Sequence, residues 1–213
     1  MFAESISEND VVDTYKTIAA PAQGLYKEKG SKFLAFAYPI GTPDEAKALI
    51  EAKRKEFHDA RHVCYAYMLG AARTNFRTND DGEPSGTAGR PILGQINAND
   101  LSDILIIVVR YFGGILLGTS GLATAYKTAA AEAIGAAQII ERIVETRYKI
   151  SCSYAQLNRV MRLIKDLKMS LLTQNQAIIC ELTVGIRQSY ETQLLERINQ
   201  ITFEGITIEK IET

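Results

Sequence analysis

Six consecutive apolar residues, Ile104–Val109, constrain the fold of this chain more than any other feature of its sequence. All six are isoleucine, leucine or valine, and the β-branched ones among them favour strands. Because successive side chains of a strand point to opposite faces, a strand that is apolar throughout must be covered on both faces. The segment 103–111 is therefore predicted to be a central strand of a sheet.

Helix signals on both sides of this strand indicate a mixed α and β domain. Thr42 has the features of an N-cap, with a proline after it and a glutamate three residues further on. A short helix is expected at 90–96, and a longer alanine-rich helix is expected at 121–138, with Thr119 or Ser120 as its N-cap. The other strands expected in this part of the chain are 14–18, 23–27, 31–40 and 62–69.

The last third of the chain has a different order of predicted strands and helices. In about 65 residues it predicts the order strand, helix, strand, strand, helix, strand, which is typical of the split βαβ, ferredoxin-like arrangement. We therefore expect an α+β protein with two domains, residues 1–143 and residues 144–213, of which the second is ferredoxin-like. Its expected strands are 147–154, 170–173, 177–185 and 205–211, and its expected helices are 156–168 and 189–201.

Composition excludes several classes of protein. The chain has 213 residues and a formal net charge of −1, so recognition of nucleic acid by bulk charge is excluded. Its cysteines, Cys64, Cys152 and Cys180, are scattered and odd in number, which argues against a disulfide framework and a thiolate zinc site. The N-terminus has no signal-peptide pattern, and no apolar stretch reaches about 20 residues. We expect a cytoplasmic protein with no membrane span.

The end of the central strand carries the first candidate site. Arg110 is followed by Gly113 and Gly114, and a helix is expected to begin at Thr119 or Ser120. Glycines allow close approach to a ligand, and the free N–H groups of a helix N-terminus attract anions. The alternative is tight strand–helix packing with an ordinary Ser or Thr cap. The glycine spacing matches no nucleotide-binding fingerprint.

An acidic, glycine-containing loop, 78–89, carries the second candidate site. Its composition is not expected to form a regular strand. Three carboxylates close together could hold a hard cation or act as acid and base. The alternative is a solvated turn whose acids cap the following helix. No EF-hand register is present, so no metal is assigned. The candidate residues are Asp80, Asp81, Glu83, Ser85 and Thr87.

Two further patterns carry less weight. His62 and Cys64 fall on one face of a predicted strand, close to His58, the other histidine of the chain. A Cys–His pair can support nucleophilic chemistry or metal binding, but a metal site normally has more ligands, so a structural or surface role is favoured. Ser120 does not stand in the GxSxG pattern of a nucleophile. We assign no catalytic residue, no metal and no cofactor.

Four segments of the first domain form a specific set. They are Lys29–Phe33 (KGSKF), Asp59–Cys64 (DARHVC), Asp80–Gly89 (DDGEPSGTAG) and Val109–Gly118 (VRYFGGILLG). Together they resemble the YigZ/IMPACT family, and the length and two-domain layout resemble its bacterial YigZ-type members. A valine follows the histidine of DARHVC, where a second histidine is common in the family. The second domain has no such motif and depends on its pattern alone.

The resemblance implies a first domain similar to the second domain of a small-subunit ribosomal protein, followed by a ferredoxin-like domain. This pair also resembles the last two domains of elongation factor G. Eukaryotic relatives regulate translation with the help of an additional domain that this sequence lacks, so their partner is not carried over. The resemblance supplies no catalytic residues.

Two functions follow from these observations. The favoured one is a non-enzymatic, translation-associated regulator that binds RNA, the ribosome or a ribosome-bound protein. The alternative is an enzyme or sensor for a small phosphorylated ligand, bound at the glycine-rich loop and the helix starts, where Arg110 or Arg90 would neutralise the anion. A purely structural role for the 80–89 loop is a third possibility. The basic residues expected to be exposed are Lys27, Lys29, Lys32, Lys53, Arg54 and Lys55.

Overall fold

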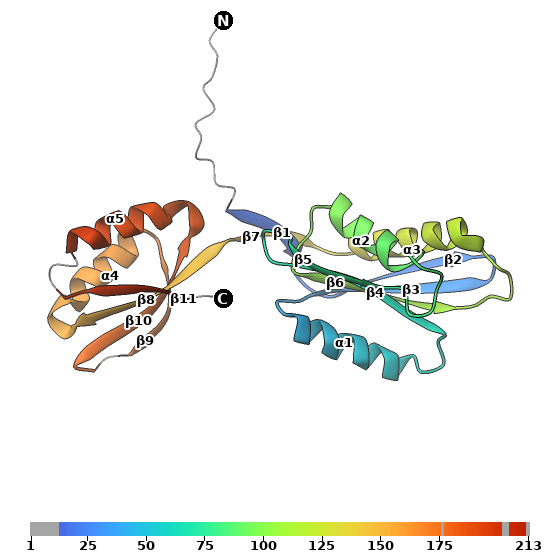
Figure 1. Cartoon of the computed structure of the whole chain (residues 1–213), viewed down its shortest axis with the longest axis horizontal. Helices are drawn as coiled ribbons and strands as arrows, with labels where there is room; N and C mark the ends of the chain where they lie inside the picture. Colours follow the sequence, from blue (N-terminus) through green and yellow to red (C-terminus); the bar gives the residue numbers. More distant parts are fainter. Residues whose placement is uncertain (1–12, 176, 202–204, 212–213) are drawn as a thin grey trace, which may run out of the picture. The chain divides into compact units, whose positions relative to one another are not determined.

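A computed structural model of the chain describes residues 13–175, 177–201 and 205–211. It forms two compact units (Figure 1). The first unit is Tyr15–Arg142, and the second combines the described residues from Ile143 onwards with Asp13 and Thr14. Asp13 belongs to the second unit because its carbonyl oxygen accepts a hydrogen bond from the Val144 N–H, at 2.6 Å. The α+β class expected from the sequence is confirmed.

One five-stranded sheet forms the centre of the first unit. All of its neighbouring strands are antiparallel, and the strand predicted to be central is the middle one. Each of the six apolar residues that led to this prediction is fully buried. The strand order is β2 (Ala22–Glu28), β3 (Ser31–Pro39), β6 (Ile104–Tyr111), β4 (His62–Leu69) and β5 (Asn75–Asn79).

Helices cover both faces of this sheet (Figure 1). One face carries α1 (Pro43–Glu56), and the other carries α2 (Gly89–Ala98) and α3 (Gly118–Gly135). Even-numbered apolar residues of β6 belong to the core under α2 and α3, and odd-numbered ones belong to the core under α1. The alanines of α3 allow close packing on the edge strand, where a Cβ added to Gly24 would lie 2.4 Å from the Ala133 nitrogen. The all-apolar strand is therefore explained by two cores.

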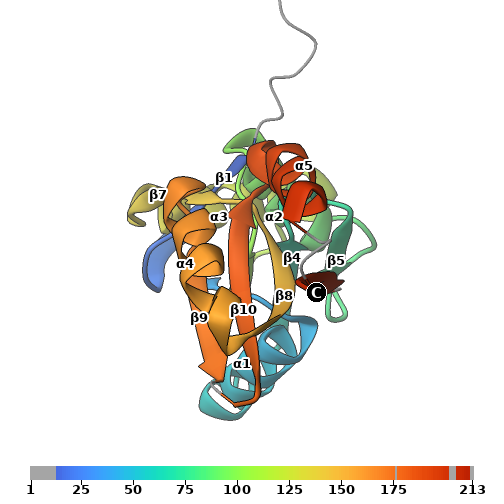
Figure 2. The same ribbon diagram turned by 90° about the vertical axis from the view of Figure 1, so that its left-hand side faces the viewer.

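A four-stranded antiparallel sheet with α4 (Leu157–Asp166) and α5 (Glu191–Ile201) on one face forms the second unit (Figure 2). Short 3-10 turns at Tyr154–Gln156 and Gln188–Tyr190 precede the two helices. The chain order and the strand order are those of the ferredoxin-like arrangement, so this prediction is confirmed. The strand order is β11 (Thr207–Ile211), β8 (Glu145–Ser153), β10 (Ile179–Arg187) and β9 (Ser170–Asn175).

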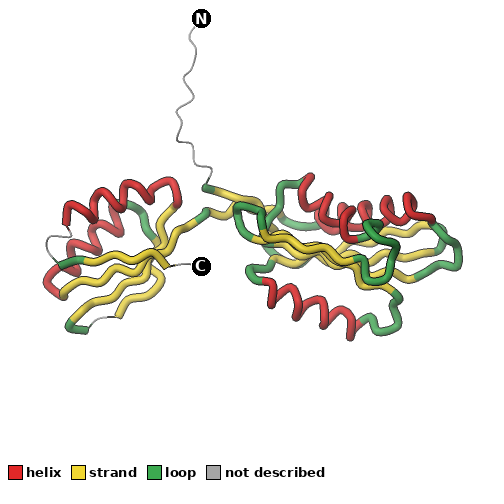
Figure 3. Tube along the Cα trace, viewed as in Figure 1, coloured by secondary structure: helices red, strands yellow, loops and turns green. Residues whose placement is uncertain are grey.

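Two strands that were not predicted appear among the strands of Figure 3. β5 includes Thr78 and Asn79, so the expectation that residues 78–89 contain no regular strand is wrong at its start. β7 (Ile139–Ile143) pairs with β1 (Thr14–Ile18) in a separate two-stranded sheet. Both are largely exposed and are held by backbone pairing, so neither shows the apolar alternation by which strands are recognised.

The start of α3 also differs from its prediction. The helix begins at Gly118, and the N-cap position is Leu117, whose side chain forms no capping hydrogen bond. Thr119 and Ser120 therefore lie inside the first turn, and the prediction that one of them is the cap is wrong. By contrast, α1 starts as predicted, because Thr42 Oγ1 accepts the Glu45 N–H at 3.2 Å. Within the described parts of the chain, no helix is both long enough and apolar enough to span a membrane.

Candidate functional site

A cavity of about 430 Å³ lies at the end of β6, where the two predicted candidate segments meet. We call it the β6-end cavity. Residues of the 80–89 loop lie on one side of it, and the start of α3 lies on the other. Its apolar lining residues are Pro84, Phe112, Leu116, Leu117 and Leu122. Its other lining residues are Arg61, His62, Glu83, Arg110, Gly118 and Thr119.

A buried ion pair forms part of the cavity wall. Arg110 Nη1 donates to Glu83 Oε1 at 2.6 Å, and the side chains are 7% and 3% exposed. Tyr126 OH donates to the same oxygen at 2.9 Å. The guanidinium carbon of Arg110 lies 5.5 Å from the Phe33 ring and 5.6 Å from the Phe112 ring. Its Nε is buried and has no hydrogen-bond partner among the described residues, so this arginine retains donor capacity.

His62 lies beside this pair in a defined tautomer. Its Nδ1 is 2.8 Å from the carbonyl oxygen of Asp81, and a carbonyl oxygen only accepts, so Nδ1 carries the proton. Its Nε2 is 3.9 Å from Glu83 Oε1. The ring therefore presents its Nε2 towards the Glu83 carboxylate in the cavity wall.

Asp80 fills the N-terminus of α2. Its Oδ1 accepts from the N–H groups of Ala88 and Gly89, at 3.0 and 2.8 Å, and its Oδ2 accepts from the Gly86 N–H at 2.8 Å. Burial raises the pKa of Asp80, but these three N–H groups and the charge of Arg90 together hold the pKa below its ordinary value. The alternative interpretation, that acids of this loop cap the following helix, describes Asp80 well. The Asp80 carboxylate therefore occupies the place at the N-terminus of α2 where an external anion would bind.

The other candidates of the 80–89 loop point to different partners. Asp81 pairs with Arg54 at 2.6 Å and accepts the Val63 N–H at 2.8 Å. Thr87 Oγ1 donates to the Pro84 carbonyl at 2.7 Å, and Ser85 is exposed. The three carboxylates therefore do not converge, and within the described residues no group of three or more His, Cys, Asp or Glu side chains could hold a metal ion.

The glycines before α3 have different roles. A Cβ added to Gly113 would lie 2.0 Å from the carbonyl carbon of Gly30, so this glycine is required by the close approach of two backbones. Gly114 has a φ of +87° and faces open space. Thr119 lines the β6-end cavity, whereas Ser120 lines a different hollow near Lys29. Only part of the predicted glycine-rich site therefore faces the cavity.

Cys64 and Tyr126 lie beneath the cavity and are not exposed to it. Cys64 Sγ is 3.3 Å from the Tyr126 hydroxyl, and both residues are buried. Burial raises the pKa of the Cys64 thiol and the pKa of the Tyr126 hydroxyl, so both keep their protons near neutral pH. Neither is poised as a nucleophile. Tyr126 was missed by the sequence analysis, although it lies four residues after Leu122 on the apolar face of α3.

Comparisons with known proteins agree with the motif set. Residues 29–134 match the Impact N-terminal domain. An IMPACT family member from Escherichia coli K12, YigZ, is 38% identical over 148 residues, which cover 68% of this chain and 72% of the relative. The chain belongs to the IMPACT family. The resemblance inferred from the four motifs is therefore confirmed, and every residue that lines the β6-end cavity lies within the matched part.

Two further comparisons extend over more of this IMPACT family chain. A family member from Haemophilus influenzae is 32% identical over 175 residues, which cover 79% of this chain and 85% of the relative. A crystal structure described as that of a hypothetical protein aligns with a TM-score of 0.72 at 29% identity. It covers 94% of this chain and 98% of the other, so the similarity includes both units.

Proposed function

We propose that this chain is a non-enzymatic regulator associated with translation, and that it acts in the cytoplasm by binding RNA, including RNA of the ribosome. Membership of the IMPACT family supports the link to translation. The observation that carries the proposal is a groove of about 510 Å³ on the first unit, on the α1 face of the five-stranded sheet. The groove is lined by Leu25, Lys27, Gly30, Lys32, Leu34, Phe57, Tyr111 and Phe112.

Strand register places basic and aromatic side chains of this groove in one row. Lys27 of β2 pairs with Lys32 of β3, and Lys32 pairs with Tyr111 of β6. Residues directly opposite in neighbouring antiparallel strands point to the same face, and like charges in such positions repel. No described residue forms an ion pair with either lysine. An anionic partner lying along this row would remove the repulsion.

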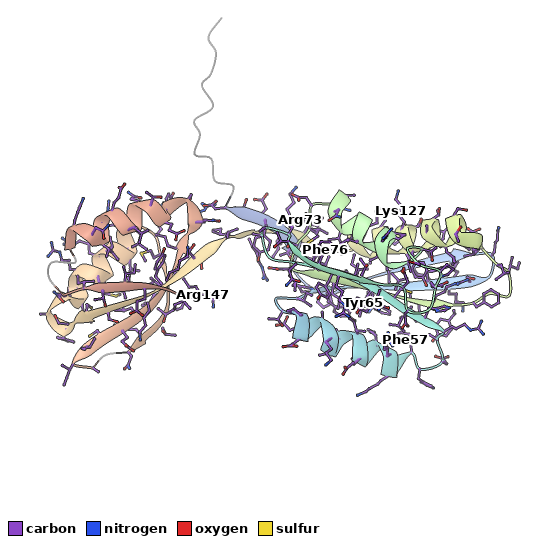
Figure 4. The ribbon with its side chains drawn as sticks, viewed as in Figure 1. Phe57, Tyr65, Arg73, Phe76, Lys127 and Arg147 are labelled. Atoms are coloured by element: carbon purple, nitrogen blue, oxygen red, sulfur yellow. The ribbon has the colours of Figure 1, made fainter. Side chains whose placement is uncertain are left out.

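The aromatic side chains of the groove suit single-stranded RNA. Phe57 follows the last residue of α1 (Figure 4), and Phe112, which is 43% exposed, follows β6. Bases stack on such rings and phosphates bind the lysines, a combination common to proteins that bind single strands. Lys29 is exposed at the turn between β2 and β3 and extends the basic row.

Other basic residues are less suited to this role. Lys53 lies 4.0 Å from the centre of the Phe36 ring and pairs with Glu56 at 2.7 Å, and Arg54 pairs with Asp81. In the second unit, Lys149 pairs with Glu181 at 2.6 Å on the sheet face opposite the helices. The RNA contact is therefore assigned to the groove of the first unit.

The proposal is tested by binding to a fluorescent single-stranded RNA and by co-sedimentation with ribosomes, both at graded salt. The native chain should bind at low salt and dissociate as salt rises. The double variant Lys27→Glu/Lys32→Glu should bind at least tenfold more weakly, and its log–log salt slope should fall by about 1.4, or about 0.7 for each lost phosphate contact.

A charge-matched control is available on exposed helix positions. Lys55→Glu/Lys127→Glu changes the net charge by the same amount, and both lysines are exposed outside the groove (Figure 4 labels Lys127). This variant should retain native binding. Absence of association at any salt, or equal weakening by the two double variants, would contradict the proposal.

A further inference from the structure

We propose that the β6-end cavity binds a small phosphate monoester with an apolar or aromatic body. The phosphate would lie between Arg110 and the N-terminus of α3, and the body would pack on the apolar wall. This is a second ligand, independent of the RNA proposed above, because the groove lies on the α1 face of the sheet and the cavity lies towards α3.

The N-terminus of α3 is open to an anion. Gly118 and Thr119 are its first residues and line the cavity, and among the described residues no side chain accepts a hydrogen bond from the helix start. The first four N–H groups of a helix have no partner within it, and the helix dipole makes this end positive. In α1 and α2, by contrast, N–H groups of the helix start donate to the side chains of Thr42 and Asp80. Without a side-chain cap, the first N–H groups of α3 are available to a phosphate.

A second, independent observation points to the same ligand. Arg110 is more than nine-tenths buried, lines the cavity, and has an Nε without a partner among the described residues. The bond to Glu83 uses Nη1 only, so a phosphate in the cavity would meet a guanidinium that has further donors. Arg61 and Arg110 both line the cavity and Glu83 offsets only one of their two charges, so these three side chains leave a net positive charge.

The walls define the rest of the ligand. Leu116 lines the cavity and is nevertheless 83% exposed. It lies in a short segment between Gly114 and Gly118, which have φ values of +87° and +72°. A ligand with an apolar body would remove this exposed apolar surface from water. A volume of about 430 Å³ is within the range of small-molecule sites.

The test uses the full chain and phenyl phosphate as the probe, with inorganic phosphate and benzoate as partial probes, followed by calorimetry and by amide NMR shifts. Phenyl phosphate should bind saturably and at least tenfold more tightly than either partial probe. The amides of Gly118 and Thr119 should shift. Failure of phenyl phosphate to bind saturably would overturn the proposal, as would benzoate binding equally well.

Three variants locate the site. Arg110→Lys, which keeps the charge but loses the planar fork, should weaken binding of phenyl phosphate at least tenfold, and Arg61→Ala should weaken it at least threefold. Lys127→Ala, on an exposed position of α3, should bind as the native chain does. Native affinity in both arginine variants would overturn the assignment. If Arg110→Lys does not fold, Arg61→Ala and the two amide shifts decide.

The RNA groove provides an independent arm of this test. The variant Lys27→Glu/Lys32→Glu should bind phenyl phosphate with native affinity, because neither lysine lines the cavity. If this variant loses both RNA and phenyl phosphate, the probe binds in the groove and the cavity assignment is wrong. Phe112 lines both hollows and is therefore not used as a test position.

Discussion

Two helices of the first unit begin in similar sequence but with different electrostatics. Both α2 and α3 start at a glycine, Gly89 and Gly118, next to small residues. At α2 the Asp80 carboxylate accepts two N–H groups of the helix start. At α3 no carboxylate of the described residues does so, and Arg110 lies in the wall of the adjoining cavity. One helix start carries its own anion, and the other is available to an external one.

This difference shows that a glycine-rich helix start is not by itself a binding site. The positive end of the dipole is the same in both helices, so what distinguishes them is whether the chain supplies a carboxylate. A buried arginine strengthens the open site, because the ion pair with Glu83 uses only Nη1 of a guanidinium that lines the cavity. The capacity of a helix start to bind an anion therefore depends on whether its N–H groups already have an acceptor, and not on the glycine-rich sequence alone.

The largest expected effect concerns the ion pair beside α3. Glu83→Leu removes the partner of Arg110 and leaves a buried positive charge, so the free energy of unfolding should fall by about 3–5 kcal/mol. Urea unfolding followed by circular dichroism measures this change. The control is Glu56→Ala, which removes the exposed partner of Lys53 on α1 and should cost less than about 1 kcal/mol. Equal costs for the two variants would show that the pair is not buried in solution.

The next effect concerns the base of the loop that leads into α3. Gly113→Ala places a methyl group 2.0 Å from the Gly30 carbonyl carbon, which belongs to backbone and cannot move cheaply. Overpacking of this kind costs about 1–3 kcal/mol. Gly94→Ala is the control, since its added methyl group meets no atom within 4 Å and it lies in α2, where alanine stabilises by about 0.5–1 kcal/mol. Thermal melting should separate the two variants in opposite directions.

Much of the fold could be predicted because burial leaves a pattern in the sequence. The all-apolar β6, the Thr42 cap and the strand–helix order of the second unit are signals of this kind. β5 and β7 could not be predicted, because exposed strands are specified by pairing partners far along the chain rather than by their own residues.

The region of the candidate site could be predicted from the sequence, but the arrangement of its side chains could not. Asp80 and Glu83 were predicted in one candidate site and Arg110 in another, whereas the structure pairs Glu83 with Arg110 and leaves Asp80 as a helix cap. No spacing rule distinguishes these roles, because the partners are 9 and 27 positions apart in the chain. Arg61 and Leu116 were not assigned to a cavity, because the cavity forms only where segments that are far apart in the sequence come together in the fold.

A smaller effect is expected at the N-terminus of α2, where replacing Asp80 would leave the helix N–H groups without the carboxylate that they now bind. Asp80→Ala removes the acceptor of three N–H groups, and loss of a helix cap costs about 1–2 kcal/mol. Asp80→Asn keeps an acceptor oxygen and should cost less. Chemical unfolding of both variants tests the order. If the alanine variant is as stable as the native chain, Asp80 does not cap α2 in solution.

The smallest expected effect is the pH dependence of the unfolding free energy that results from Asp80 at the N-terminus of α2. The pKa of Asp80 is lowered in the folded state, because the N–H groups of Gly86, Ala88 and Gly89, with the charge of Arg90, stabilise the carboxylate more than burial disfavours it. Its contribution to stability is therefore complete above the unfolded pKa of about 3.9 and is lost as pH falls through the folded pKa. The difference in unfolding free energy between the native chain and Asp80→Asn should be constant from pH 7 to about pH 5 and shrink below about pH 4. A difference that stays constant down to pH 2 would mean that the charge of Asp80 has no part in capping α2, and the contrast with α3 would then reduce to hydrogen bonding alone.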